Sequence, residues 1–165
     1  MHLPPTHATS KGNSMVRDPI AFELFRNTLL SIADEMALTI LRTAYSGVLR
    51  DNMDYSTAFC DGDGRTVAQG LTLPAHLSSF PDALAATIAR YGDRMKSGDI
   101  YCLNDPFEGG MHIPDVFVLK PIFFEGERVA FAATICHQTD MAAASRAPTP
   151  PTPPRSTRKG CASRP

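Results

Sequence analysis

Two neighbouring strand-like segments constrain the fold of this chain more than any other feature. Residues 116–124 and 128–136 are rich in β-branched and aromatic side chains, and Glu125-Gly126-Glu127 separates them. A short glycine-containing connection between two such segments is typical of a β-hairpin. The hairpin returns the chain to the edge where it started, so the residues just before 116 and just after 136 are predicted to lie side by side.

The same four-residue spacing occurs at both ends of this hairpin. His112-x-x-Asp115 precedes it, and His137-x-x-Asp140 follows 25 residues later. Neutral imidazoles and carboxylates are ordinary ligands of a divalent metal ion. The first copy ends the segment 104–115, where a proline and two adjacent glycines predict a loop. The sequence therefore predicts a metal site made by His112, Asp115 and His137; the alternative is two polar loop clusters satisfied by the backbone.

Two helices are predicted outside the hairpin. Asp18-Pro19 is typical of a helix start, and apolar residues then recur at helical spacing as far as about Tyr45. Gly47 is expected to end this helix. Residues 81–91 form a second amphipathic pattern, which Gly92 is expected to close.

Three further strands complete a predicted α+β fold. Residues 55–60 and 66–69 flank the turn Asp61-Gly62-Asp63-Gly64, and a short strand is expected at 100–103. The acidic turn is not an EF-hand loop, because strands flank it and no glutamate occupies the twelfth loop position. The predicted fold therefore combines a long N-terminal helix, β-hairpins and a second helix.

Composition and charge narrow the function class. The chain is 43% hydrophobic and 20% charged, has no apolar run of 18 residues and has no secretory signal in residues 1–15, which predicts a cytoplasmic protein without a membrane partner. Residues 142–165 hold five basic residues and no acidic one, which leaves 11 basic and 17 acidic residues, a net charge of −6, in residues 1–141. An acidic body argues against a nucleic-acid partner.

The cysteines are expected to be reduced thiols. Cys60, Cys102 and Cys136 fall inside predicted strands, and none of the four cysteines, Cys161 included, belongs to a Cys-x-x-Cys pair. This pattern favours buried free thiols over disulfides or a zinc knuckle.

Three regions are expected along the chain. Residues 1–14 are polar and irregular and are interpreted as a disordered leader, residues 15–141 as the folded part, and residues 142–165 as a disordered proline-rich tail. The tail is compatible with a frameshift: one guanine restored after the codon of Met141, with third bases freely chosen, permits a continuation that begins Gly-Gly-Arg-Val-Pro-Gly. The alternative is a genuine proline-rich ligand for a partner protein.

Several dispersed motifs resemble the N-terminal part of hydantoinase B/oxoprolinase proteins, the B subunits of N-methylhydantoinase-type and acetone-carboxylase-type enzymes. The resemblance runs from about Asp18 to Met141 and rests on Asp18-Pro19-Ile20, Arg50-Asp51-Asn52-Met53-Asp54-Tyr55-Ser56, Pro74-Ala75-His76-Leu77, Asn104-Asp105-Pro106 through His112-Ile113-Pro114-Asp115, and His137-Gln138-Thr139-Asp140. The restored reading frame is similar to the family's continuation. The chain would then be an incomplete, N-terminal portion of a larger domain.

The resemblance implies an ATP-dependent enzyme with separate subunits. An actin-like hydantoinase A-type subunit would handle ATP, and the B subunit would hold a metal and complete the reaction on a small-molecule substrate. For hydantoinases and oxoprolinases that reaction opens a cyclic amide; the acetone-carboxylase relatives join a carbonyl compound to bicarbonate. The sequence contains no Gly-x-x-x-x-Gly-Lys-Ser/Thr motif, which agrees with ATP chemistry on another chain.

The resemblance also implies roles for individual residues. His112, Asp115 and His137 fall on metal ligands, and Asp51 falls on a fourth position where the family usually has glutamate. His76 is a candidate acid/base or substrate contact, and Asp140 a candidate carboxylate that orients His137; the alternatives are a structural histidine and a solvated aspartate. Mixed His/Asp ligation suits manganese, zinc or iron. A different hypothesis is a small metal-binding or interaction module whose proline-rich tail recruits a partner.

Overall fold

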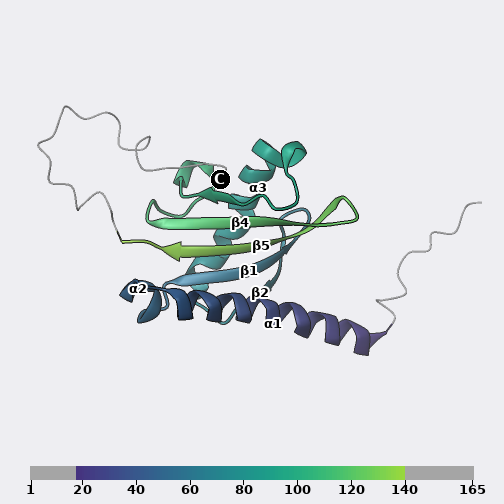
Figure 1. The fold of residues 1–165 in the computed structure, drawn as a ribbon, viewed down its shortest axis with the longest axis horizontal. Coiled ribbons are helices and arrows are strands. Elements are labelled where there is room, and N and C mark those ends of the chain that lie inside the picture. Colours follow the sequence, from purple (N-terminus) through teal and green to yellow (C-terminus); the bar gives the residue numbers. More distant parts are fainter. Residues whose placement is uncertain (1–17, 140–165) are drawn as a thin grey trace, which may run out of the picture.

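The computed structural model describes residues 18–139, which form a mixed fold of helices and one antiparallel sheet (Figure 1). In the labels used here, η marks a short 3-10 helix. The elements are α1 (Pro19–Thr43), α2 (Gly47–Arg50), β1 (Tyr55–Asp61), β2 (Thr66–Gln69), η2 (Pro74–Ser79), α3 (Phe80–Tyr91), η3 (Gly92–Arg94), β3 (Tyr101–Leu103), η4 (Pro106–Glu108), β4 (Asp115–Phe124) and β5 (Glu127–His137). The predicted α+β class is confirmed.

The sheet has the strand order β2-β1-β5-β4-β3, and every neighbouring pair is antiparallel. The predicted β4–β5 hairpin is confirmed, with Phe124 paired to Glu127 across a two-residue turn. Both turn residues have positive φ, 50° at Glu125 and 86° at Gly126, as a tight hairpin turn of the right twist requires. β5 therefore lies at the centre of the sheet, between its sequence neighbour β4 and the distant strand β1.

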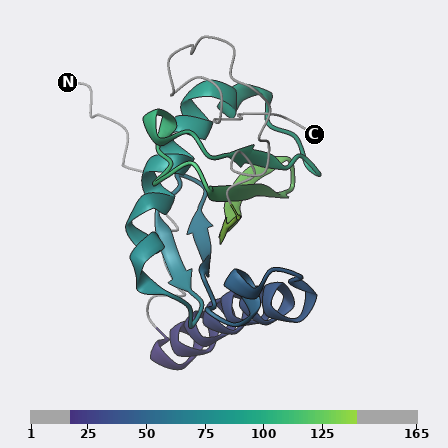
Figure 2. The same ribbon diagram turned by 90° about the vertical axis from the view of Figure 1, so that its left-hand side faces the viewer.

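The two long helices contact β1 on opposite faces. Ala58 and Cys60 belong to the main core, which contains Phe80 and Leu84 of α3. On the other face, Tyr55 belongs to a smaller cluster with Ala37 of α1, and the buried Thr57 hydroxyl donates a hydrogen bond to the Ala33 carbonyl. Figures 1 and 2 show α1 running along the β1–β2 side of the sheet. β1 is therefore buried on both faces.

The ends of α1 follow partly from local sequence. The Asp18 carboxylate accepts hydrogen bonds from the backbone N–H groups of Ile20 and Ala21, at 2.9 and 3.2 Å, as predicted for an N-cap. The prediction that Gly47 ends this helix was wrong: α1 ends at Thr43, and Gly47 begins α2. The reason is that the Ser46 hydroxyl accepts a hydrogen bond from the Val48 N–H and caps a new helical turn.

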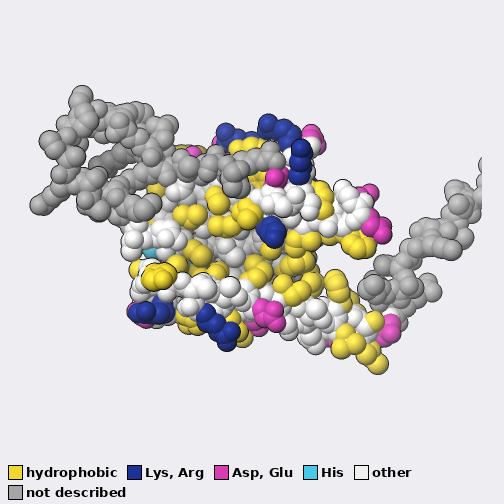
Figure 3. All heavy atoms as spheres, in the orientation of Figure 1, with side chains coloured by type: hydrophobic (Ala, Val, Ile, Leu, Met, Phe, Trp, Pro, Cys, Tyr) yellow, Lys and Arg dark blue, Asp and Glu magenta, His cyan; other side chains and the backbone are white. Residues whose placement is uncertain are grey.

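The first half of α1 is largely unburied. The helix residues that are buried are Leu29, Ala33 and Ala37, whereas Ile20, Phe22, Leu24 and Phe25 are 73%, 52%, 65% and 53% exposed. Figure 1 shows this end of α1 extending beyond the sheet, and Figure 3 shows apolar side chains along it. The apolar spacing thus identified the helix correctly but not which of its residues are buried.

Some expectations fall outside the described residues. The leader at 1–14 and the tail at 142–165 are among them, so their interpretation stays a prediction.

Within residues 18–139, no helix is both long enough and apolar enough to cross a membrane. Cys60, Cys102 and Cys136 lie in β1, β3 and β5, and none of them forms a disulfide within residues 18–139, as expected. Cys60 is buried, whereas Cys102 and Cys136 are only partly buried, contrary to the expectation.

Two phenylalanines test this division between core and exposed helix. Phe117 is fully buried in the main core, so Phe117→Ala should lower the free energy of unfolding by about 3–5 kcal/mol. Phe25 is 53% exposed, so Phe25→Ala should change the free energy of unfolding by no more than about 0.5 kcal/mol. Urea unfolding followed by circular dichroism measures both, and equal losses would contradict the assignment.

Candidate metal centre

The register of the β4–β5 hairpin brings the two His-x-x-Asp segments together. Asp115 is the first residue of β4, and its cross-strand partner is His137, the last residue of β5. The pairing continues past the strand ends, because the Gln138 N–H donates to the Pro114 carbonyl at 2.8 Å. The expected proximity of the two ends of the hairpin is therefore observed.

His112 reaches the same place through a turn. The Asp115 N–H donates to the His112 carbonyl at 2.9 Å, and the Asn104 side chain donates to the Ile113 carbonyl at 2.8 Å. Further back in this loop Gly109 has a φ of 88°, and a Cβ there would lie 2.6 Å from the Asp82 carbonyl oxygen. The glycine thus permits close packing of the loop against the start of α3.

The three predicted ligands converge on one point. Their potential ligand atoms all lie within 4.8 Å of one another. Asp115 is fully buried, and its two carboxylate oxygens lie 2.6 Å from His112 Nδ1 and 3.1 Å from His137 Nδ1. The two imidazole rings are 5.0 Å apart between centroids and inclined by 32°. The His112 side chain is 53% exposed and that of His137 is 24% exposed, so solvent reaches the cluster from one side.

His76 joins this cluster from a different part of the chain. It was expected in a loop but lies in η2, where it is only 5% exposed. Its Nδ1 lies 3.2 Å from Ser56 Oγ, and its Nε2 lies 3.5 Å from Asp54 Oδ1 and 3.9 Å from Asp115 Oδ2. The predicted acid/base candidate thus has Nε2 near Asp54 and near Asp115, one of the three predicted metal ligands.

Asp54 is the site residue that sequence reasoning missed. Its Oδ2 lies 3.8 Å from His137 Nδ1, and its backbone carbonyl accepts a hydrogen bond from the His137 N–H at 3.1 Å. In the sequence, Asp54 stands out only as one residue of the motif that runs from Arg50 to Ser56. The pairing of β1 with β5, strands separated by about 70 residues in the chain, brings it to the cluster, and no local pattern predicts that pairing.

Asp51 and Asp140, two other predicted site residues, are not brought into the cluster. Asp51 follows α2 as its C-cap, is 61% exposed, and accepts a hydrogen bond from Arg50 Nε at 3.0 Å. This carboxylate raises the pKa of the Arg50 guanidinium through the hydrogen bond and its charge. Asp140 lies outside the described residues.

The donor set fits a divalent cation. Two imidazoles and a carboxylate bind manganese, zinc or iron, and three protein ligands leave coordination positions for a substrate or water. The Asp115 carboxylate is fully buried, and all its ion pairs within residues 18–139 are to histidines. Neighbouring Cys136 packs against the apolar cluster that contains Leu49 and Tyr55, and burial raises the pKa of its thiol to about 11. The cluster is therefore of the mixed His/Asp type that the sequence predicted.

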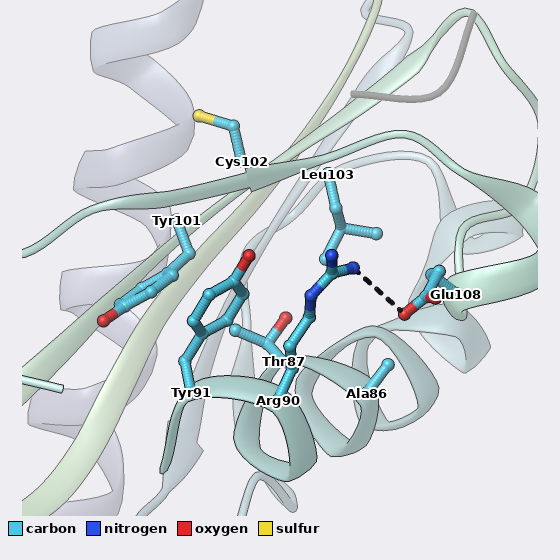
Figure 4. Close-up of a pocket in the computed structure, with 8 residues that line it drawn as sticks. All are labelled: Ala86, Thr87, Arg90, Tyr91, Tyr101, Cys102, Leu103 and Glu108. Carbon is cyan, nitrogen blue, oxygen red and sulfur yellow. Dashed lines mark ion pairs between the residues drawn. The ribbon is translucent and has the colours of Figure 1, made fainter. Parts of the chain in front are cut away.

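A separate pocket lies between α3 and β3 (Figure 4). The Arg90 guanidinium and the Glu108 carboxylate form an ion pair across it at 3.8 Å, and the rings of Tyr91 and Tyr101 contact each other with centroids 5.2 Å apart. None of the predicted site residues lines this pocket. It is therefore distinct from the His/Asp cluster.

Comparisons with known proteins point to one protein family. The sequence profile of the family described as hydantoinase B/oxoprolinase matches residues 18–161. A 5-oxoprolinase of Dictyostelium discoideum is 32% identical over 142 residues, which are 86% of this chain and 11% of that protein. The caprolactamase subunit beta of Pseudomonas jessenii is 36% identical over 124 residues, 75% of this chain and 21% of the relative.

Two solved structures are also similar. The crystal structure of the ATP-dependent caprolactamase from Pseudomonas jessenii matches with a TM-score of 0.63 and 30% identity, over 74% of this chain and 21% of the other. Nucleotide-free acetone carboxylase matches with a TM-score of 0.67 at 21% identity, over 74% of this chain and 16% of the other, which indicates a common fold. The chain thus spans about a quarter or less of each of these proteins, and it belongs to the hydantoinase B/oxoprolinase family.

Proposed function

We propose that this chain is the N-terminal, metal-binding portion of a subunit that opens cyclic amides in an ATP-dependent enzyme. The observation that carries the proposal is the convergence of His112, Asp115 and His137, of which Asp115 is fully buried. The names of the relatives add the substrate class, because 5-oxoprolinase and caprolactamase are both named for cyclic amides. The activity belongs to the whole enzyme, of which this chain covers a small part.

A metal site suits the opening of a cyclic amide because cyclic amides are poor electrophiles. A divalent ion would polarise the amide carbonyl and so stabilise the transition state by several kcal/mol. In this proposal His112, Asp115 and His137 hold the ion, and the partial exposure of His112 leaves access for a small substrate. His76, buried beside them, is suited to orient a reacting group or exchange a proton through Nε2.

The ATP-dependent step is assigned to a separate hydantoinase A-type subunit. The relative from Pseudomonas jessenii is named a subunit beta, and the solved caprolactamase is named ATP-dependent, so the name of the relative supports a partner chain. Acetone carboxylation is the less favoured alternative, since the likeness to acetone carboxylase, at 21% identity, extends to the fold alone.

Metal binding is the first test of this proposal. Titration with Mn²⁺ or Zn²⁺ should show one site per chain, and a metal concentration about 100-fold above Kd should stabilise the fold by about 2.7 kcal/mol. Asp115→Asn keeps the shape of the buried side chain but removes its charge, so it should weaken binding by about 100-fold or more. Calorimetry measures the affinity, and urea unfolding without metal checks that the variant is folded. Unchanged affinity in the folded variant would refute the site.

Asp51 requires a test of its own as a proposed fourth ligand. Its carboxylate would have to leave Arg50 and reach further than it does here, so Asp51→Glu, longer by one methylene, should raise the metal affinity. Asp63→Glu is a matched control, because Asp63 is also an exposed aspartate paired with an arginine, Arg65, but lies in the β1–β2 turn. Equal affinities of both variants and the unmodified chain would remove Asp51 from the ligand set.

Activity should require more than this chain. With ATP, Mn²⁺ and 5-oxoproline or caprolactam, the 165-residue chain alone should show no turnover, because it spans 21% of the similar caprolactamase chain. A version with the reading frame restored after Met141, combined with an A-type subunit, should gain activity if the frameshift interpretation holds. Product formation is measured by chromatography. Turnover by the short chain without a partner would contradict the proposed division of labour.

A further inference from the structure

The face of the sheet that carries α1 is covered by this helix only in part. Strand register places Thr57 of β1, Thr134 of β5 and Val118 of β4 in one row across this face. Thr57 is fully buried beneath α1, whereas Thr134 and Val118 are only partly buried. α1 contacts mainly β1 and β2, and Figure 1 shows β4 and β5 beside it with no helix in front of them.

The uncovered part of this face is mostly apolar. Figure 3 shows apolar side chains gathered over these strands, above α1. An antiparallel sheet with one face in solvent usually alternates apolar and polar side chains along each strand, whereas β4 is apolar on both faces apart from one lysine. The sheet therefore has the composition of one that is covered on both sides. We call this surface the open face; it comprises Val116, Val118, Lys120 and Ile122 of β4 and Ala132 and Thr134 of β5.

Two exposed apolar residues of α1 border the open face. The Asp34 carboxylate accepts a hydrogen bond from the backbone N–H of Leu71, which follows the edge strand β2, so this side of α1 faces the edge of the sheet. Ile32 lies two residues before Asp34, roughly 200° around the helix, and therefore faces the opposite way, toward the open face. Phe25 lies two turns earlier on the same side. Their exposed fractions are 37% and 53%.

Lys120 restricts what can cover the open face. Its side chain is exposed, and none of the ion pairs within residues 18–139 includes it. A cover that buries this ammonium group must bring a carboxylate, because burying an unpaired charge is costly. A second copy packed through the same face would set one Lys120 against the other, since a two-fold contact joins identical patches. Charge therefore disfavours a dimer through this face.

The terminal segments of this chain do not match the open face either. Residues 1–17 contain no acidic residue. Residues 142–165 contain neither an acidic residue nor a large aliphatic or aromatic one. An apolar cover that also supplies a carboxylate must therefore come from a different segment.

We propose that a helix of the same subunit, from the part that follows β5 in the longer relatives, covers the open face and places a carboxylate opposite Lys120. At about 4.8 Å per strand, β5, β4 and β3 span roughly 14 Å, which suits one helix of about 10–12 Å beside α1. The chain leaves β5 at one end of this face, so a short connection is enough. The similar caprolactamase chain has the length for such a helix, because this chain spans 21% of it. The inference rests on the proposed function, in which this chain is the N-terminal portion of a longer subunit.

Amine labelling of the unmodified proteins tests this cover. In the 165-residue chain, acetylation followed by mass spectrometry should modify Lys120 about as fast as Lys96, an exposed lysine in the turn after η3. In the version with the reading frame restored after Met141, Lys120 should react at least about 10-fold more slowly and Lys96 at an unchanged rate. An unchanged rate at Lys120, or a restored frame that soon reaches a stop codon, would overturn the inference.

The other occupants give different results in the same measurement. Protection of Lys120 only after an A-type subunit is added would assign the open face to that subunit and overturn the proposed cover. Protection in the 165-residue chain that increases with protein concentration would assign it to a second copy, with the same consequence. Mn²⁺ calorimetry on the longer protein separates this inference from the proposed metal site: bound Mn²⁺ with a reactive Lys120 overturns only the cover, and a protected Lys120 without Mn²⁺ binding overturns only the metal site.

Charge reversal tests the carboxylate. In the longer protein, Lys120→Glu should lower Tm by about 4 °C or more, because it sets two carboxylates against each other in a buried contact. Lys96→Glu is the matched control and should change Tm by no more than about 1 °C, as should both substitutions in the 165-residue chain. Equal shifts for the two variants of the longer protein would overturn the pairing of Lys120; the labelling result does not depend on either variant folding.

Discussion

The candidate site depends on the pairing of Asp115 with His137 across the β4–β5 hairpin. The tight turn at Glu125-Gly126 starts the pairing, and an irregularity between Ile122 and Phe123 then shifts the register by one residue. From Ile122, paired with Ala130, the antiparallel ladder continues to Asp115 and His137. A slip of one residue would turn Asp115 and His137 to opposite faces of the sheet. The hairpin core, with Phe117, Leu119, Phe131 and Ile135 fully buried, opposes such a slip because the strand that slipped would turn its own core side chains to the other face.

A fully buried carboxylate makes this end of the sheet energetically unusual. Burying an isolated charge is costly unless it is paired and hydrogen-bonded. Asp115 has His112, His137 and His76 as its neighbours of opposite potential charge within the described part of the chain. This cost supports the proposed metal site, because apolar side chains would fill the same volume with a smaller desolvation penalty.

The third contribution to the site comes from the central position of β1. Its pairing with β5 places Asp54 beside His137, and its buried Ser56 side chain reaches His76 in η2. α1 and α3 cover β1 from opposite faces and so hold the strand in place. The exposed apolar residues at the start of α1, by contrast, contribute nothing to this scaffold in the described residues.

The sequence by itself determined the local elements and the main motif. The Asp18 cap, the hairpin turns and the strand patterns predicted all five strands and both long helices within a few residues, because each depends on neighbours in the chain. The repeated His-x-x-Asp spacing beside a hairpin was enough to predict that His112, Asp115 and His137 meet, and they do.

Only the tertiary structure decided the rest. The β1–β5 pairing added Asp54 and the packing of η2 on β1 brought in His76, whereas Asp51 lies exposed beside Arg50 in this structure. These outcomes depend on contacts between residues tens of positions apart, whose closure is set by the packing of the whole core and leaves no periodic or local trace in the sequence.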